Sequence, residues 1–152
     1  MVKSNSRIVG LDTTALVAFH IASHRHHTEA RDAVSSIVKG GGRLALCPVV
    51  LDEFVHITTD VRRFERPLSM SVAVNCLDRM LSGKETMLVL PTQSSVAQQW
   101  GWMTEHRLGR KRIHDTEIAA IYSGQGIREI MTTNERDFRI FDGFTILDWI
   151  HA

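Results

Sequence analysis

The sequence predicts an α/β fold, a three-layer α/β/α sandwich around a mainly parallel five-stranded sheet. Short runs rich in aliphatic and β-branched residues alternate with longer segments whose apolar residues recur at helical spacing. Strands that alternate with helices in this way form parallel βαβ units. The length of 152 residues fits one domain spanning residues 1–152, and the 43% of hydrophobic residues is enough for a core.

The expected elements follow one another along the chain. Strands are predicted at residues 7–11, 44–47, 87–90, 129–133 and 144–147. Helices are predicted at residues 13–23, 28–39, 48–59, 68–81, 94–106 and 113–123, and residues 134–141 are read as a loop or a short helix. Thr13 or Thr14 is available to cap the first helix, three glycines from Gly40 stop the second, and Pro48 suits the first turn of the third. The fourth helix should turn four apolar residues inward, namely Val72, Leu77, Met80 and Leu81.

The charge balance gives no general argument for nucleic-acid binding. Lys and Arg total 18 and Asp and Glu total 17, so the formal net charge is +1. Attraction to a polyanion would need a local patch or a metal ion. Residues 1–12 lack the long apolar run of a signal peptide, and no run is long enough to span a membrane. We therefore expect a cytoplasmic protein in which Cys47 and Cys76 are reduced core thiols.

Two acidic residues follow predicted strands. Asp12 comes directly after the first strand, and Asp137 lies in the segment after the strand that ends at Thr133. In open α/β sheets, ligand sites lie at the carboxyl ends of strands. Both residues are therefore natural candidates for a functional site.

Two further acidic residues lie early in predicted helices, where the helical phase can be checked. Asp115 precedes Ile118 and Ala119 by three and four residues, so its carboxyl group should point toward the interior. Glu53 also shares a face with apolar residues of its helix, although phase alone separates it poorly from Asp52. A half-buried carboxylate is costly unless it is paired or binds a cation.

The alternative explanation for each acid is helix capping or simple solvation, and for any one of them alone that explanation is favoured. Four acids at strand ends and neighbouring helix starts instead suit Mg²⁺ or Mn²⁺, since these ions prefer carboxylate and water oxygens. Such ions lower the pKa of an attacking water and neutralise a leaving oxygen at a phosphodiester. The ion would also reverse the local negative charge that repels nucleic acid.

Four segments resemble the signature stretches of PIN domains, and most closely those of the VapC-type toxins of bacterial and archaeal toxin–antitoxin pairs. The segments are residues 8–17, 51–54, 114–120 and 132–138, and their order and spread cover nearly the whole chain. Thr14 departs from the pattern, because Asn is common at that position in the family. Residues 62–67 match no motif of the family.

The resemblance implies a PIN-like fold of five parallel strands flanked by helices. It implies that Mg²⁺ or Mn²⁺ is held, directly or through water, by the four acids Asp12, Glu53, Asp115 and Asp137. Asn134 matches a site-lining position, and we expect Thr13, Thr133 and His114 to line the same site. The implied reaction is RNA hydrolysis by metal-activated water. The implied partners are RNA, a small antitoxin whose tail occupies the groove, and a second copy of the chain in a homodimer.

Two basic groups are candidates for RNA contact, with an ordinary solvated loop as the alternative for each. The first group is Arg110, Lys111 and Arg112, with Arg107 close by, and it leads into the helix of Asp115. The second group is Arg62, Arg63 and Arg66. Contacts of this type would hold phosphates without reading sequence.

Other functional interpretations are less well supported. His20 and His24 have a spacing that zinc sites use, but no HExxH pattern or cysteine pair accompanies them, so a solvated helix end is favoured. A phosphatase of the haloacid-dehalogenase type would need an Asp where Thr14 stands. A PIN-fold RNA-binding or assembly module without turnover remains the alternative to a nuclease.

Overall fold

The computed structural model describes residues 6–151 of the chain. Its sheet contains β1 (Ile8–Leu11), β2 (Arg43–Leu46), β3 (Thr86–Leu88), β4 (Glu129–Met131) and β5 (Thr145–Ile146). All four strand pairings are parallel, and the strand order is β3-β2-β1-β4-β5. The predicted α/β architecture with a five-stranded parallel sheet is confirmed.

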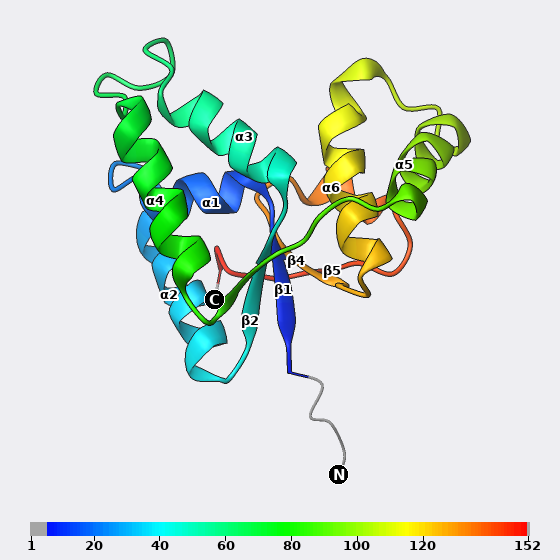
Figure 1. The fold of residues 1–152 in the computed structure, drawn as a ribbon, viewed down its shortest axis with the longest axis horizontal. Coiled ribbons are helices and arrows are strands. Elements are labelled where there is room, and N and C mark those ends of the chain that lie inside the picture. The colour runs from blue at the N-terminus through cyan, green and yellow to red at the C-terminus, as the bar shows by residue number, and fades with distance from the viewer. Residues whose placement is uncertain (1–5, 152) are drawn as a thin grey trace.

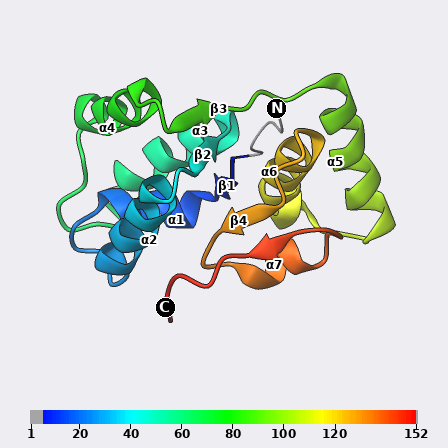
Figure 2. The same ribbon diagram turned by 90° about the horizontal axis from the view of Figure 1, so that it is seen from below.

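Helices cover both faces of the sheet and complete the sandwich (Figures 1 and 2). The first group is α1 (Thr13–His20), α2 (His27–Lys39), α3 (Pro48–Thr58) and α4 (Met70–Ser82). The second group is α5 (Gln93–Glu105), the 3₁₀ turn η1 (Arg110–Arg112), α6 (Ile113–Gly124) and α7 (Glu135–Arg139). The first group lies on one side of the sheet and the second on the other, which is what right-handed crossovers produce when the chain reverses direction across a sheet.

The sheet places its switch point beside β1. The chain moves outward from β1 to β2 and β3, and then returns to the other side of β1 as β4. Leu11 pairs with Met131 in the last register step, so the residues after these two strands, Asp12 and Thr132, are neighbours. A switch point of this kind is where open α/β sheets bind ligands.

Tyr122 of α6 fixes the second helix layer against this part of the sheet. Its ring is fully buried, and its hydroxyl donates to the carbonyl oxygens of Leu11 at 2.6 Å and Ala45 at 3.0 Å. Gly10 allows the close approach, because a Cβ there would lie 2.7 Å from the ring carbons Cδ2 and Cε2 of Tyr122. The contact ties α6 to the end of the strand that carries Asp12.

Several expected details differ from the structure. Asp12, rather than Thr13 or Thr14, caps α1, because its Oδ1 accepts from the Thr13 N–H at 2.7 Å. The inward position predicted for Val72 is wrong, since this side chain is 46% exposed. Ala73 takes the buried position, four residues before the buried Leu77 and therefore on the same face of α4.

The strand that was expected to reach residue 133 ends at Met131, because Thr132 turns away to bond with Asp12. Both cysteines are free thiols, with Cys47 buried and Cys76 half-buried. Between residues 6 and 151, none of the helices combines the length and the apolar character that a membrane span requires. The expectation that the chain lacks a signal peptide concerns in part residues 1–5, which lie outside the described residues.

Candidate active site

Asp12 lies at the carboxyl end of β1, and the surrounding residues hold it firmly. Its carboxyl group is 2% exposed and accepts hydrogen bonds from the Thr13 N–H at 2.7 Å, the Thr132 hydroxyl at 2.7 Å and the Thr14 hydroxyl at 3.1 Å. Thr14 in turn accepts from the Thr133 N–H at 3.0 Å. The end of β1 and the segment after β4 are thereby joined around one carboxylate.

Glu53 reaches the same region from α3. The Thr13 hydroxyl donates to its Oε2, so consecutive residues Asp12 and Thr13 connect the carboxylates of two different elements. The structure also separates Glu53 from its neighbour Asp52, which helical phase left open. Glu53 is half-buried against the site, whereas Asp52 is exposed.

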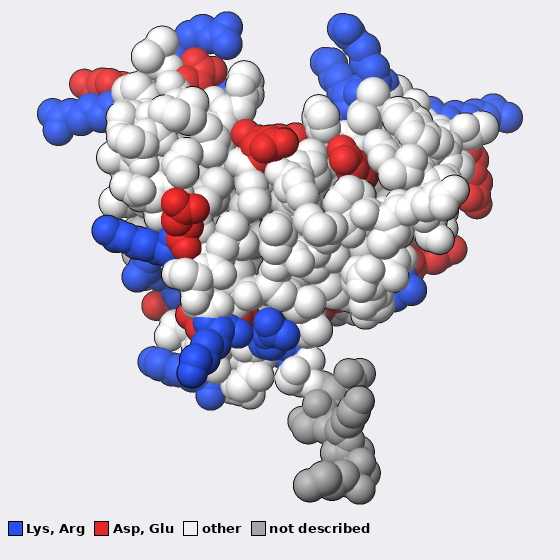
Figure 3. Space-filling view, viewed as in Figure 1, with Lys and Arg blue, Asp and Glu red and all other residues white. Residues whose placement is uncertain are grey.

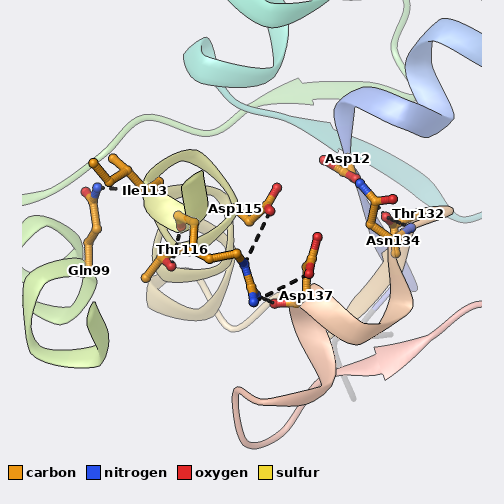
Figure 4. A network of polar contacts seen from close by, with 9 residues as sticks. Asp12, Gln99, Ile113, Asp115, Thr116, Thr132, Asn134 and Asp137 are labelled. Atoms are coloured by element: carbon orange, nitrogen blue, oxygen red, sulfur yellow. Dashed lines mark hydrogen bonds and ion pairs between the residues drawn. The ribbon is translucent and has the colours of Figure 1, made fainter. Parts of the chain in front are cut away.

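Asp115 and Asp137 meet on the other side of Asp12, and Arg112 lies between them. The Nε atom of Arg112 is 3.7 Å from Asp115 Oδ2, and its Nη1 atom is 3.4 Å from Asp137 Oδ1. Figure 4 shows both carboxylates joined through this guanidinium, with Asp12 facing them from the end of the sheet. As the helical phase of α6 predicted, Asp115 lies on its inward side, near the buried Ile118 and Ala119.

Burial and neighbouring charges both shift the pKa values of the acids. Burial raises the pKa of Asp12, hydrogen bonds from Thr132, Thr13 and Thr14 oppose the rise, and the charge of Glu53 adds to it. The pKa of Asp115 is raised to about 7, first by burial and then by the charges of Asp12 and Asp137, while Arg112 opposes the rise. Negative charge is therefore in excess at this point of the molecule.

The donor set fits a hard divalent cation held largely through water. The four acids offer only oxygen ligands, and the mutual repulsion at Asp115 is what a bound cation would relieve. Among residues 6–151, no group of three or more His, Cys, Asp or Glu side chains lies close enough together to hold a metal ion. Mg²⁺ needs only one or two carboxylates directly and keeps several waters, so the residues present fit that mode of binding.

The site opens into a notch between two lobes of the molecule. Figure 3 shows acidic side chains on the floor of the notch and basic side chains at the tips of the lobes. One tip is the loop between α3 and α4 and the other is the turn between α5 and α6 (Figure 1). A groove of about 520 Å³ lies on this side, with Glu53 and His56 of α3 facing His114 and Glu117 of α6.

The remaining predicted site residues fall into two groups. His114 is exposed beside the groove and pairs with Glu117 at 3.7 Å, and Asn134 is exposed close to Asp12 (Figure 4). Arg110 and Lys111 are exposed at the rim, as an RNA contact requires.

Arg112 differs from the expected RNA contact. Its side chain is only 24% exposed and faces the acids instead of solvent. The basic segment therefore divides into two exposed cations at the rim and one cation inside the acidic centre.

Sequence reasoning missed the support that Thr132 and Arg112 provide. Thr132 is 2% exposed, and besides binding Asp12 its hydroxyl accepts from the Asn134 N–H at 2.9 Å. The available signal for Thr132 was a polar residue near the carboxyl end of the strand predicted at residues 129–133. The position of Arg112, three residues before Asp115, was the signal for an ion pair on one helical face.

The histidine cluster gives no zinc site among the described residues 6–151, but the expected solvated helix end is wrong for His20. Its ring packs edge-on against Phe19 and Phe54, with centroids 4.9 Å and 5.2 Å away. Burial lowers the pKa of His20 to about 4, with smaller contributions from Arg31 and His27. His20 is therefore a half-buried residue whose imidazole is neutral at pH 7.

The parallel sheet with acids at its switch point defines the PIN-like class of α/β/α fold, and the comparisons agree. No family model and no curated protein matches the sequence. Among solved structures, VapBC2 from Rickettsia felis bound to a promoter DNA fragment matches with a TM-score of 0.68 and 16% identity, over 93% of this chain and 98% of that one.

Two other VapC-related structures show the same fold. VapC20 of Mycobacterium tuberculosis, described as a sarcin–ricin-loop-cleaving toxin, matches with a TM-score of 0.64 and 19% identity over 80% of this chain and 86% of that one. DNA-bound VapBC from Salmonella typhimurium matches with a TM-score of 0.64 and 17% identity, over 95% of this chain and 98% of that one. The predicted resemblance to VapC-type PIN domains is thus confirmed for the fold.

Proposed function

We propose that the protein is a metal-dependent endoribonuclease that hydrolyses RNA phosphodiester bonds, and that it is the toxin of a type II toxin–antitoxin pair acting in the cytoplasm. One observation carries the proposal: carboxylates from four distant segments lie around the carboxyl ends of β1 and β4, where Thr13, Arg112 and their own charges link them. Burial, and after it the charges of Asp12 and Asp137, raise the pKa of Asp115, and Thr13 connects Glu53 to Asp12. A fold likeness to a toxin described as sarcin–ricin-loop-cleaving supports the same conclusion.

The chemistry divides between the acids and the residues that hold them. Asp12, Glu53, Asp115 and Asp137 would hold Mg²⁺ or Mn²⁺, directly or through water. When bound, such an ion activates water and neutralises charge at the phosphodiester. Thr14 and Thr132 hold the Asp12 carboxylate in place, and because their hydroxyls donate to it they oppose the rise that burial causes in its pKa.

The rims of the notch suit the backbone of a structured or single-stranded RNA. Arg110 and Lys111 are exposed on one side, and Arg62 and Arg63 on the other, where their side chains are 83% and 57% exposed. Cations at the rim hold phosphates, while acids on the floor would repel them without a metal ion. His114, Thr133 and Asn134 would line the path between rim and floor.

The proposed partners follow from the fold likeness. Several structures that match are VapBC complexes, and one is described as a toxin–antitoxin complex from Klebsiella pneumoniae. We infer a small antitoxin whose tail occupies the groove, and a homodimer. Exposed apolar side chains on α4 and α5, among them Met70 at 60% and Trp100 at 52%, are available for such contacts.

Cleavage of RNA by the purified protein tests the proposed reaction. We expect cleavage with Mg²⁺ or Mn²⁺, none with EDTA, and a loss of about 100-fold or more for Asp12→Asn. Glu53→Gln should lose at least about tenfold more activity than the matched variant Asp52→Asn, because only Glu53 faces the site. Full activity in Asp12→Asn and Asp115→Asn would refute the assigned mechanism, and RNA binding without cleavage would support a non-catalytic module.

Expression in cells tests the toxin assignment separately. Growth should slow when the protein is produced alone and recover when the product of a small neighbouring gene is produced with it. Unimpaired growth at high expression would count against the toxin assignment while leaving the nuclease chemistry untouched.

A further inference from the structure

Arg112 occupies an unusual position inside the acidic centre. It ends η1 and caps α6, and its backbone carbonyl accepts from the Thr116 hydroxyl at 2.6 Å, which fixes the base of the side chain. The side chain is 24% exposed and lies between Asp115 and Asp137. A cation thus already lies between two of the carboxylates to which the proposed function assigns a metal ion.

The contacts hold the guanidinium by charge more than by hydrogen bonds to the carboxylates. The separations of 3.7 Å to Asp115 and 3.4 Å to Asp137 are longer than the roughly 2.7–2.9 Å of charge-assisted hydrogen bonds. The guanidinium makes one short hydrogen bond: Arg112 Nη2 donates to the backbone carbonyl oxygen of Asp137 at 2.6 Å. The Nε atom is buried and has no hydrogen-bond partner within residues 6–151.

This arrangement leaves the two carboxylates free to change partners. The hydrogen bond to a backbone carbonyl keeps Arg112 in place without using any carboxylate oxygen. The guanidinium satisfies the carboxylates themselves only at long range, so a divalent cation can take their oxygens without breaking a short bond. A second cation in the same space would repel the guanidinium strongly, because the site is partly buried.

We propose that Arg112 is an internal counter-ion that stands in for the divalent cation between Asp115 and Asp137 and competes with it. In the metal-free protein the guanidinium neutralises the acids, and ion binding releases it from them. Arg112 thereby sets the threshold of divalent-ion concentration at which the site fills. This inference rests on the proposed metal site, but it concerns ion binding and can fail while the nuclease function stands.

Mn²⁺ binding to the purified protein, followed by calorimetry or electron paramagnetic resonance at about pH 8.5, where Asp115 is ionised, tests the inference without any cleavage assay. Removal of the competing charge in Arg112→Gln should tighten Mn²⁺ binding at least about tenfold. The matched control is Arg136→Gln, which removes the same charge from an exposed position next to Asp137 and should change the affinity less than about twofold. Arg112→Lys keeps the charge and should stay close to the wild type.

The outcomes separate the two proposals. Unchanged or weaker Mn²⁺ binding by Arg112→Gln, with normal binding by the wild type, overturns the role of Arg112 and leaves the metal site standing. Absence of Mn²⁺ binding in every variant overturns both. If Arg112→Gln does not fold, the Nε–H resonance of Arg112 in the wild type decides: it should shift with Mg²⁺ in step with site occupancy, and a resonance that stays fixed overturns the inference.

Discussion

Replacement of Asp115 by asparagine should make the metal-free protein more stable while it abolishes ion binding. The raised pKa of about 7 means that ionised Asp115 is disfavoured in the folded state relative to its ordinary value of 3.8. A difference of about 3 in pKa corresponds to roughly 4 kcal/mol, and solvent screening at this partly exposed carboxyl reduces that to about 1–2 kcal/mol. An amide side chain at this position would carry no charge and would escape this cost.

The sign of the pH dependence follows from proton linkage. Between about pH 4 and 7 the folded protein keeps a proton on Asp115 that the unfolded chain releases, so the free energy of unfolding falls as the pH rises through this window. The advantage of Asp115→Asn should therefore be full above about pH 7 and should shrink as the pH falls toward about 4. Urea unfolding in EDTA at about pH 8 and about pH 5, on either side of the raised pKa, measures both values.

A matched variant and added metal complete this test. Glu105→Gln removes an exposed carboxylate of α5 and should change stability by less than about 0.5 kcal/mol at either pH. Mn²⁺ should stabilise the wild type but not Asp115→Asn, because binding to the folded state alone raises stability. Equal or lower stability of Asp115→Asn than of the wild type, in EDTA at the higher pH, would refute the argument that burial and the neighbouring acids disfavour the ionised Asp115 carboxyl.

Three further predictions concern the framework of the site. Gly10→Ala should destabilise the fold by about 1–3 kcal/mol in urea unfolding, because the added Cβ would lie 2.7 Å from the Tyr122 ring; an unchanged midpoint would contradict the packing. Tyr122→Phe should cost about 1–3 kcal/mol in the same assay, since the buried carbonyls of Leu11 and Ala45 lose a donor, and a neutral effect would show that the hydroxyl is dispensable. The pKa of His20, lowered from 6.5 to about 4, predicts stability that is full above pH 6.5 and declines toward about pH 4 by up to about 3 kcal/mol; His20→Met should flatten that decline, and an identical pH profile would exclude His20 as its source.

Hydrophobic periodicity was sufficient to predict the order of elements. Each predicted strand and helix is present, and its ends differ from the prediction by at most about three residues. The apolar pattern of a segment indicates that an element exists, but it does not fix the residue at which that element ends. The error at Val72 has a different origin. Val72 lies five residues before Leu77, about 140° away around a helix, whereas Ala73 lies four residues before Leu77 and shares its buried face.

The candidate site was only partly predictable, since its geometry depends on tertiary contacts. Helical phase placed Asp115 on the inward face of α6, but it did not separate Glu53 from Asp52. In the structure, Glu53 differs from Asp52 because it accepts a hydrogen bond from Thr13. The two partners are 40 residues apart in the sequence, so a local sequence pattern does not predict the bond. The position of Arg112 between two acids likewise depends on where α7 packs against α6.

His20 shows the opposite failure, in which polar residues nearby gave a misleading signal. The run of histidines after α1 indicated a solvated helix end, yet the His20 ring fills a space beside Phe54 of α3. α1 and α3 contact each other because both pack on the same side of the sheet, and sequence spacing does not report that contact.

Anomalous scattering from crystals soaked in Mn²⁺ would show whether Asp12, Glu53, Asp115 and Asp137 share one divalent-cation site. A shared site predicts one or two peaks in the space between these four carboxylates, with water completing the coordination. Crystals that take up Mn²⁺ only elsewhere, or that show no peak in this space at millimolar Mn²⁺, would contradict it.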